Sequence, residues 1–193
     1  MNTSTEPPLA PPGAGLPAIE HLVARALFRL RRATGHRASF TAKFEREREK
    51  IRALLSACDA KSGARRVRIR RPPGLEDSSR DWSVWMTLDH LRIVHLEMAR
   101  VITSLANGHA PKGQASTAAV KPSPAADARI RADYEASCDA LLAAAATVPD
   151  LNTSARFPHP WFGSMNAFEW YALAGGHMGI HRTQIERILA GLL

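Results

Sequence analysis

The sequence predicts an all-α protein, a four-helix bundle preceded by an extra N-terminal helix. Long segments repeat apolar residues at steps of three and four, which is the spacing of one helix face. The alternating pattern typical of strands is almost absent, and Val67-Arg68-Ile69-Arg70, which carries it, has no obvious pairing partner. A chain of 193 residues, 45% of them hydrophobic, can bury one substantial core. These observations indicate a single helical core.

The N-terminal region is expected to stand apart from the bundle. Residues 1–16 are rich in Pro, Ala, Gly and Thr, a composition typical of a disordered tail. From about residue 17 to residue 32, apolar residues follow helical spacing at Ile19, Leu22, Val23, Ala26 and Leu30. Thr34-Gly35-His36 interrupts this pattern. We therefore expect an accessory helix over residues 17–37 and a bundle domain over residues 38–193.

Two helices are predicted in the first half of the bundle domain. The first covers residues 39–60 and Gly63 ends it, before Pro72-Pro73-Gly74 requires a loop. Asp81 can cap the second helix, because its charge complements the positive helix end. Asn107-Gly108 ends that helix. Its buried face is predicted to carry Thr87, Leu91, Val94, Met98, Val101 and Leu105.

The second half of the domain supplies two more helices. Residues 108–123 form a long connection without periodicity, which can carry a crossover between two parallel helices, the second and the third. The third helix is expected over about residues 124–147, followed by an irregular, proline-containing segment over residues 148–165. Asn166 and Glu169 form a capping-box pair that opens the last helix.

Composition limits the classes of protein to which the chain can belong. No apolar run approaches the roughly 20 residues that span a bilayer, so we expect no membrane association. The N-terminus lacks the basic start and apolar core of a signal peptide. Cys58 and Cys138 lack disulfide or metal spacing and suit small packing residues in a reducing compartment. A cytoplasmic location is therefore the expectation.

Three histidines are candidate metal ligands. His177 and His181 are four residues apart, so both imidazoles project from one side of the last helix, as in helices that supply two ligands to one metal. They lie on an apolar stripe, where two hydrogen-bonded core histidines are the alternative interpretation. His90 on the second helix lies at the edge of the buried face. His95 is about 140° further round that helix, so we expect only one of the two to point inward, and His90 is the better candidate.

The order of these motifs resembles a known family. Leu88-Asp89-His90-Leu91 precedes His159-Pro160-Trp161-Phe162-Gly163, Asn166-Ala167-Phe168-Glu169-Trp170 and finally His177-x-x-x-His181-x-x-Gln184-Ile185. Over residues 38–193 the chain resembles the DinB/YfiT-like superfamily of metal-binding four-helix bundles. The resemblance implies that His90, His177 and His181 bind a divalent metal ion, nickel or zinc first, with iron or manganese as further possibilities. Some members of the family resemble thiol-dependent transferases that use a low-molecular-weight thiol, others resemble metal-dependent hydrolases, and many have no assigned reaction. The resemblance therefore implies an enzyme of one of these two types, acting on a small molecule, as one of several possible functions.

Other polar residues of the chain are expected to have structural rather than chemical roles. We expect Asp89 to be solvated, Glu169 to cap its helix and Tyr134 to pack in the core. His159 either lines the mouth of the site or packs within its proline-flanked loop, and the second role is favoured. Neither cysteine has a basic partner nearby in sequence, so neither is an evident nucleophile. The sequence therefore describes the site better than the reaction.

The positive charge of the chain leaves two alternatives to an enzyme. The formal net charge is +8, and five arginines crowd one short segment: Arg65, Arg66, Arg68, Arg70 and Arg71. Such a cluster can bind phosphates, but a solvated loop balanced partly by Glu76 and Asp77 is the favoured interpretation, and we do not expect nucleic acid as a partner. A non-catalytic metal-binding protein with a stress-linked or regulatory role is the other alternative. Leu96 and Ile93, on outer faces, suggest a homodimer.

Overall fold

A computed structural model describes residues 7–193 of the chain. Residues 1–6, part of the tail expected to be disordered, lie outside the described residues. Residues 7–16 form an irregular segment with a turn at Pro12-Gly13. This segment contacts the loop that precedes the second bundle helix, where the backbone N–H of Ala10 donates to Asp77 over 2.8 Å. This part of the tail therefore lies against the folded protein.

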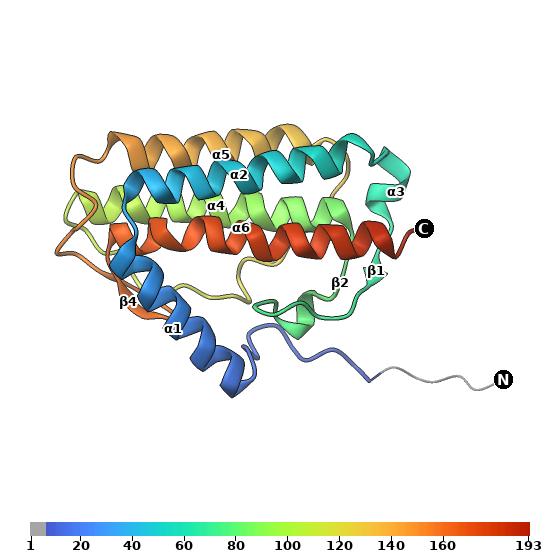
Figure 1. The fold of residues 1–193 in the computed structure, drawn as a ribbon, viewed down its shortest axis with the longest axis horizontal. Helices are drawn as coiled ribbons and strands as arrows, with labels where there is room; N and C mark the ends of the chain where they lie inside the picture. Colours follow the sequence, from blue (N-terminus) through green and yellow to red (C-terminus); the bar gives the residue numbers. More distant parts are fainter. Residues whose placement is uncertain (1–6) are drawn as a thin grey trace.

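Four long helices form the bundle, as the sequence predicts. They are α2 (Arg37–Ser56), α4 (Val84–Ala106), α5 (Ile130–Thr147) and α6 (Ala167–Ala190). Helix α4 packs against both α5 and α6, and α2 packs against α6. Figure 1 shows that α4 and α5 run in the same direction, opposite to α2 and α6. The long connection between α4 and α5 is therefore a crossover between parallel neighbours, as predicted.

The bundle core follows the predicted periodicity closely in α4. Every residue of its predicted buried face is at most 8% exposed: Thr87, Leu91, Val94, Met98, Val101 and Leu105. Residues from the other three helices complete this layer, among them Phe44, Ile51, Leu141 and Ile185, each fully buried. Burial of this apolar surface is the main free-energy contribution that holds the four helices together.

Helix α1 (Ala18–Thr34) differs from the expectation for an amphipathic helix. Its predicted apolar face is exposed, with Ile19 at 80% and Leu22 at 70%, and its buried large side chain is Phe28, on the opposite side. Phe28 lies 4.6 Å from the ring of Phe162, and the Arg31 side chain donates to the carbonyl of Ala172 on α6. Figure 1 shows α1 leaving one end of the bundle at an angle. One edge of α1 is thus docked on the bundle, and its apolar face is not.

The connection between α2 and α4 contains more structure than predicted. Helix α2 ends at Ser56, and Gly63 lies inside a short helix, α3 (Ala60–Ala64), instead of ending α2. A Cβ at Gly63 would lie 2.2 Å from the ring of Trp85, so glycine permits this close approach of α3 to α4. The prediction that Gly63 terminates the long helix is therefore wrong: packing, not helix termination, explains the glycine.

The Val67–Arg70 segment does have a pairing partner. Strand β1 (Val67–Arg68) pairs antiparallel with β2 (Asp81–Trp82), and a short 3₁₀ turn, η1 (Asp77–Ser79), lies between them. Because Asp81 belongs to β2, it does not cap α4 as predicted; Ser83 caps the helix and accepts a hydrogen bond from the N–H of Met86.

Two further differences concern α5 and the segment before α6. Helix α5 begins at Ile130, later than predicted, because residues 124–129 form turns. The segment expected to be irregular contains a hairpin of β3 (Phe157–His159) and β4 (Gly163–Met165), in which Phe157 pairs with Met165. The predicted capping box is confirmed, since Asn166 and Glu169 each accept a hydrogen bond from the backbone N–H of the other. No helix among residues 7–193 is long and apolar enough to cross a membrane.

Candidate metal centre

Three imidazoles from two helices converge inside the protein. Nε2 of His177 lies 3.2 Å from Nε2 of His90 on α4 and 3.2 Å from Nε2 of His181 on α6. One ligand atom from each ring lies within 4.8 Å of the others. His90 and His181 are 7% and 4% exposed, and His177 is partly buried. The three histidines singled out in the sequence therefore form one cluster.

These distances fit a single metal ion. Zn–N bonds of about 2.0–2.1 Å place the nitrogens of a tetrahedral site about 3.4 Å apart and those of an octahedral face about 3.0 Å apart. The observed separations of 3.2 Å lie between these values. A cation between the three lone pairs would also remove their mutual repulsion. The cluster can therefore hold a metal ion, and nitrogen donors alone do not select its identity.

The second nitrogen of two rings is fixed by an outer acceptor. Nδ1 of His90 donates to the carbonyl of Val120 over 2.7 Å, and Nδ1 of His181 donates to Oε1 of Gln184 over 2.7 Å. Gln184 in turn donates to the carbonyl of Ser79 over 2.7 Å. With the proton held on Nδ1, the Nε2 lone pair of each ring is free to face the centre. Nδ1 of His177 is buried and has no hydrogen-bond partner among residues 7–193.

The environment keeps the cluster in the neutral, ligating form. Burial lowers the pKa of His90 to about 4. Burial, together with the neighbouring imidazoles, holds the pKa values of His177 and His181 well below the usual 6.5. At neutral pH all three rings are therefore uncharged, which is the state that binds metal.

His95 is not part of this cluster, but it is not exposed either. The side chain is fully buried on the other side of α4, where its ring lies 5.1 Å from that of Phe44 and Nδ1 lies 3.3 Å from Oγ of Ser137. The expectation that only one of His90 and His95 points inward was wrong. Both sides of α4 are interior, because the crossover and α6 cover His90 while α5 and Phe44 of α2 cover His95.

Neither cysteine is available as a nucleophile. Cys138 is fully buried beside His95, and burial raises the pKa of its thiol to about 12. Cys58 is also buried, and the two form no disulfide. Because the thiolate is the reactive species, a buried thiol of high pKa is inert. Any sulfur nucleophile at the histidine cluster must come from outside the chain.

Asp89 organises the loop that supports His90. The side chain is 5% exposed, not solvated as expected; its carboxylate accepts from the backbone N–H of Ser123 over 2.8 Å and pairs with Arg92. These contacts hold the crossover close to α4, and the same crossover supplies the carbonyl of Val120 that fixes His90. Asp89 therefore has a positioning role that its place on the helix did not reveal.

Glu169 and Tyr134 have the structural roles expected of them. Besides capping α6, Glu169 forms ion pairs with Arg32 of α1 and Arg156. Tyr134 is fully buried, with its hydroxyl 3.6 Å from the sulfur of Met178, and burial raises its pKa. Neither residue is available as a general base at the histidine cluster.

A cavity of about 910 Å³ opens beside the histidine cluster. It lies between α1, α4, α6 and three connecting segments, and all three histidines line it. His159 also lines it, while its ring packs 5.0 Å from Phe162 and 5.3 Å from Trp170. Both roles considered for His159 are therefore present at once. The volume is within the range of small-molecule sites in proteins, about 300–1,000 Å³.

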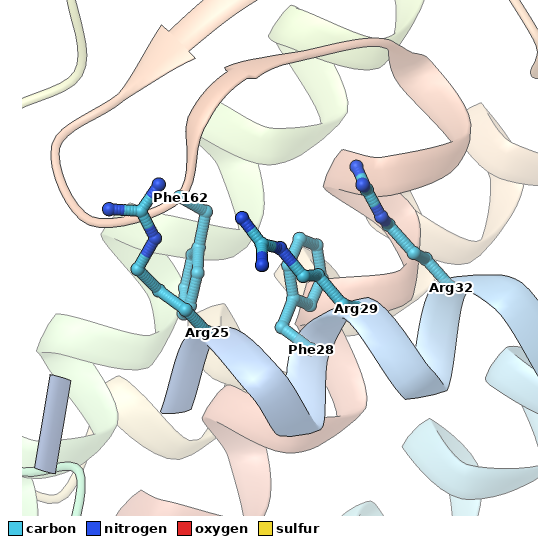
Figure 2. Close-up of a pocket in the computed structure, with 5 residues that line it drawn as sticks. All are labelled: Arg25, Phe28, Arg29, Arg32 and Phe162. Carbon is cyan, nitrogen blue, oxygen red and sulfur yellow. The ribbon is translucent and has the colours of Figure 1, made fainter. Parts of the chain in front are cut away.

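A second, much smaller cavity of about 80 Å³ lies beside α1. Figure 2 shows Arg25, Arg29 and Arg32 in a row along this helix, with Phe28 and Phe162 next to them. No nucleophile, histidine or carboxylate lines this hollow. This hollow therefore lacks the side chains that catalysis or metal binding would need.

The basic segment is partly neutralised within the protein, and only in part by the residues expected. Arg66 pairs with Asp81 over 2.7 Å and Arg71 pairs with Glu20 of α1 over 2.5 Å. Glu76 instead forms an ion pair with Lys121. Asp77 pairs with Arg80, and its charge also helps to raise the pKa of Arg71, as expected. The arginines therefore serve in part to hold the connection between α3 and α4 together and to attach α1 to it.

Comparison with known proteins shows the family and the fold of the chain. The model of the DinB superfamily matches residues 43–185, well over half of the sequence. The chain belongs to the DinB superfamily. Its fold also matches the crystal structure of TT2238, a four-helix bundle protein, with a TM-score of 0.57 and 21% identity, over 78% of this chain and 98% of that one. No curated protein sequence matches the chain.

The superfamily match includes the histidine cluster but not all of the cavity wall. His90, His177 and His181 lie within residues 43–185, as do the loops that carry Val120 and Ser79. Gln184 could have been found from the sequence, because it lies three residues after His181 on the same stripe. Val120 and Ser79 contribute backbone carbonyls from loops, which leave no signal in the sequence.

Proposed function

We propose that this DinB-superfamily protein is a metal-dependent enzyme, a thiol-dependent transferase or a hydrolase. His90, His177 and His181 would hold one divalent ion, nickel or zinc first, with iron or manganese as further candidates. The observation that carries the proposal is a set of three neutral imidazole nitrogens, two pairs of them 3.2 Å apart, at the wall of a cavity of about 910 Å³. A purely structural site would be closed to substrate.

A bound divalent cation would lower the pKa of a water or thiol at the site and polarise a substrate carbonyl. The residues of the chain have other tasks. Val120 and Gln184 keep the protons of His90 and His181 on Nδ1, and the fixed loop conformation keeps both rings aimed at one point. The cavity admits the substrate and keeps its reacting group close to these nitrogens.

The buried cysteines favour an external nucleophile. Cys58 and Cys138 are both enclosed, so a low-molecular-weight thiol or water would enter through the cavity. In the transferase reaction, the thiol sulfur would bond to an electrophilic carbon of the substrate while the leaving group departs with its electron pair. The thiol proton would pass to solvent.

Metal content is the first test. Protein purified without an affinity metal should contain close to one divalent ion per chain by elemental analysis. His177→Ala should lower this content about tenfold or more, because two nitrogens bind far more weakly than three, with an unchanged far-UV circular dichroism spectrum. His109→Ala, a change at an exposed histidine, is the matched control and should keep its metal. Equal metal content in both variants would refute the assignment.

Activity is the second measurement. The metal-loaded protein should turn over one member of a panel of thiol acceptors, esters or amides, and His177→Ala should not. Metal binding without turnover across the panel would favour the non-catalytic, regulatory alternative. The ion pairs of Arg66 and Arg71 give no support to the nucleic-acid alternative.

A further inference from the structure

The large cavity has apolar walls from three helices. Val23 and Leu27 of α1, Ile93 and Leu96 of α4, and Leu173 and Ile180 of α6 line it. Leu27 and Leu96 are 62% and 43% exposed, so they border the open side. Leu96 and Ile93 were expected to lie on a self-association surface. They instead line the same cavity as the histidine cluster.

Most charged side chains of this lining are already matched. Glu20 pairs with Arg71, Glu76 with Lys121, Glu97 with Arg100, and Arg92 with Asp89. Arg31 is the exception: its Nε donates to the Ala172 carbonyl, its guanidinium carbon lies 5.2 Å from the centre of the Phe40 ring, and its Nη2 is buried without an acceptor among the described residues. A charged substrate would compete with these internal contacts, whereas an uncharged one would leave them intact.

Helix α1 supplies one wall from outside the part of the chain that matches the superfamily model, residues 43–185. Single exposed leucines are common on protein surfaces, whereas a contiguous exposed apolar patch indicates a binding site. On α1, Leu27 and Val23 face the cavity, whereas Leu22 and Leu30 do not line it. The face of α1 toward the cavity therefore adds apolar surface from outside the residues that match the superfamily model.

We infer that the substrate is an uncharged, predominantly apolar small molecule whose apolar body lies between α1 and α4 and whose one polar group reaches the three imidazoles. This inference rests on the proposed function and deepens it by naming the substrate class. The site combines a volume suited to such a molecule with a cluster of three imidazoles at its wall, and the unpaired Nη2 of Arg31 is itself buried. Helix α1 is then the element that sets specificity.

Nile red, an uncharged apolar dye that fluoresces in apolar surroundings, tests the inference on the full-length protein. The dye should bind, and decan-1-ol should displace it at lower concentration than decanoate, since only the acid carries a charge. Leu27→Glu should weaken dye binding about tenfold, because it places a charge in the apolar wall. Leu30→Glu is the matched control: Leu30 is 61% exposed, Leu27 62%, but Leu30 does not line the cavity, so binding should stay within about twofold of wild type.

Equal dye binding by Leu27→Glu and wild type would overturn the inference. So would a loss of dye binding in Leu30→Glu as large as in Leu27→Glu, because the dye would then lie on the outer face of α1. Tighter binding of decanoate than of decan-1-ol would also overturn it, by indicating an anionic substrate. His177→Ala separates this inference from the metal assignment. If it loses metal and still binds the dye, both proposals stand. If it keeps metal, the metal assignment alone fails.

Discussion

At the scale of single residues, Glu47 shows how a buried charge can tie two helices together. The carboxylate is 1% exposed and accepts hydrogen bonds from Lys43 on its own helix, over 2.5 Å, and from Arg182 on α6, over 2.6 Å. Burial alone would raise its pKa, but these two cations outweigh burial and hold the pKa below the usual 4.5. The ionised form is therefore more stable in the folded protein than in the unfolded chain.

Glu47→Gln should accordingly destabilise the fold in a pH-dependent way. At pH 7 we expect a loss of about 2 kcal/mol in the free energy of unfolding, because two charge-assisted hydrogen bonds are weakened. Since the folded-state pKa is depressed, the contribution of Glu47 is fully present above about pH 4.5 and is lost as the pH falls through the folded-state pKa. The difference between wild type and variant in urea unfolding should therefore shrink on acidification.

A surface glutamate on the same helix provides the control for Glu47. Glu49 is 64% exposed and pairs with Arg52, so Glu49→Gln should change stability by less than about 0.5 kcal/mol at any of these pH values. A difference between Glu47→Gln and wild type that does not shrink as the pH falls below 4.5 would contradict the electrostatic origin of the effect.

The residues of the candidate site were predictable to the extent that they follow helix geometry. His177 and His181 share a helix face because they are four residues apart, and His90 lies beside the buried face of α4. The roles of Asp89 and His95 were not predictable, because each depends on which segment covers its side of α4. For Asp89 that segment is the crossover, which no helical period describes.

At the scale of elements, two adjacent glycines of α6 separate close packing from open space. A Cβ at Gly175 would lie 2.9 Å from Cγ of Lys43 and 3.1 Å from the backbone nitrogen of Phe44, both on α2. A Cβ at Gly176 would meet nothing within 4 Å. Both positions lie inside α6, but only Gly175 is in close contact with α2. Comparing alanine at the two positions therefore measures the free-energy cost of crowding the α2–α6 contact.

Alanine at these two positions should therefore change stability in opposite directions. Gly175→Ala should destabilise the protein by about 1–3 kcal/mol, because α2 and α6 must move apart or repack. Gly176→Ala should stabilise it by about 0.5–1 kcal/mol, because alanine restricts the unfolded chain and favours the helix. Thermal unfolding followed by circular dichroism measures both. Stabilisation of both variants would show that α2 and α6 do not approach each other closely at Gly175.

The helices and strands also differ in how far the sequence predicts them. The buried face of α4 was predicted residue by residue, because one strict period covers the whole helix. The alternation at Val67–Arg70 was recognised, but its partner β2 and the β3–β4 hairpin were missed, since strands of two or three residues give little periodic signal. In α1 the helix was predicted correctly, but its apolar face is exposed, because periodicity identifies an apolar face without showing what covers it.

At the scale of the whole molecule, the core and the candidate metal centre are largely separate. Fully buried side chains extend along the bundle, from Phe44 and Ile51 on α2 to Leu105 on α4 and Leu141 on α5, and none of these is a ligand. The centre itself is held by two helices and the two loops that carry Val120 and Ser79. The fold should therefore not depend on the ion, in contrast to small domains that a structural metal organises.

Removal of the metal should accordingly leave the fold in place and lower its stability. Protein treated with EDTA and then dialysed should keep its far-UV circular dichroism spectrum, because the bundle core is intact without the ion. Zinc or nickel added back should raise the Tm progressively, since an ion that binds only the folded state contributes about 2.7 kcal/mol at one hundred times its Kd. Calorimetry of His177→Ala, which should not respond to added metal, separates binding at the three-histidine centre from adventitious binding elsewhere. Loss of helical signal on chelation would mean instead that the ion organises the bundle, and the separation of core and centre would have to be abandoned.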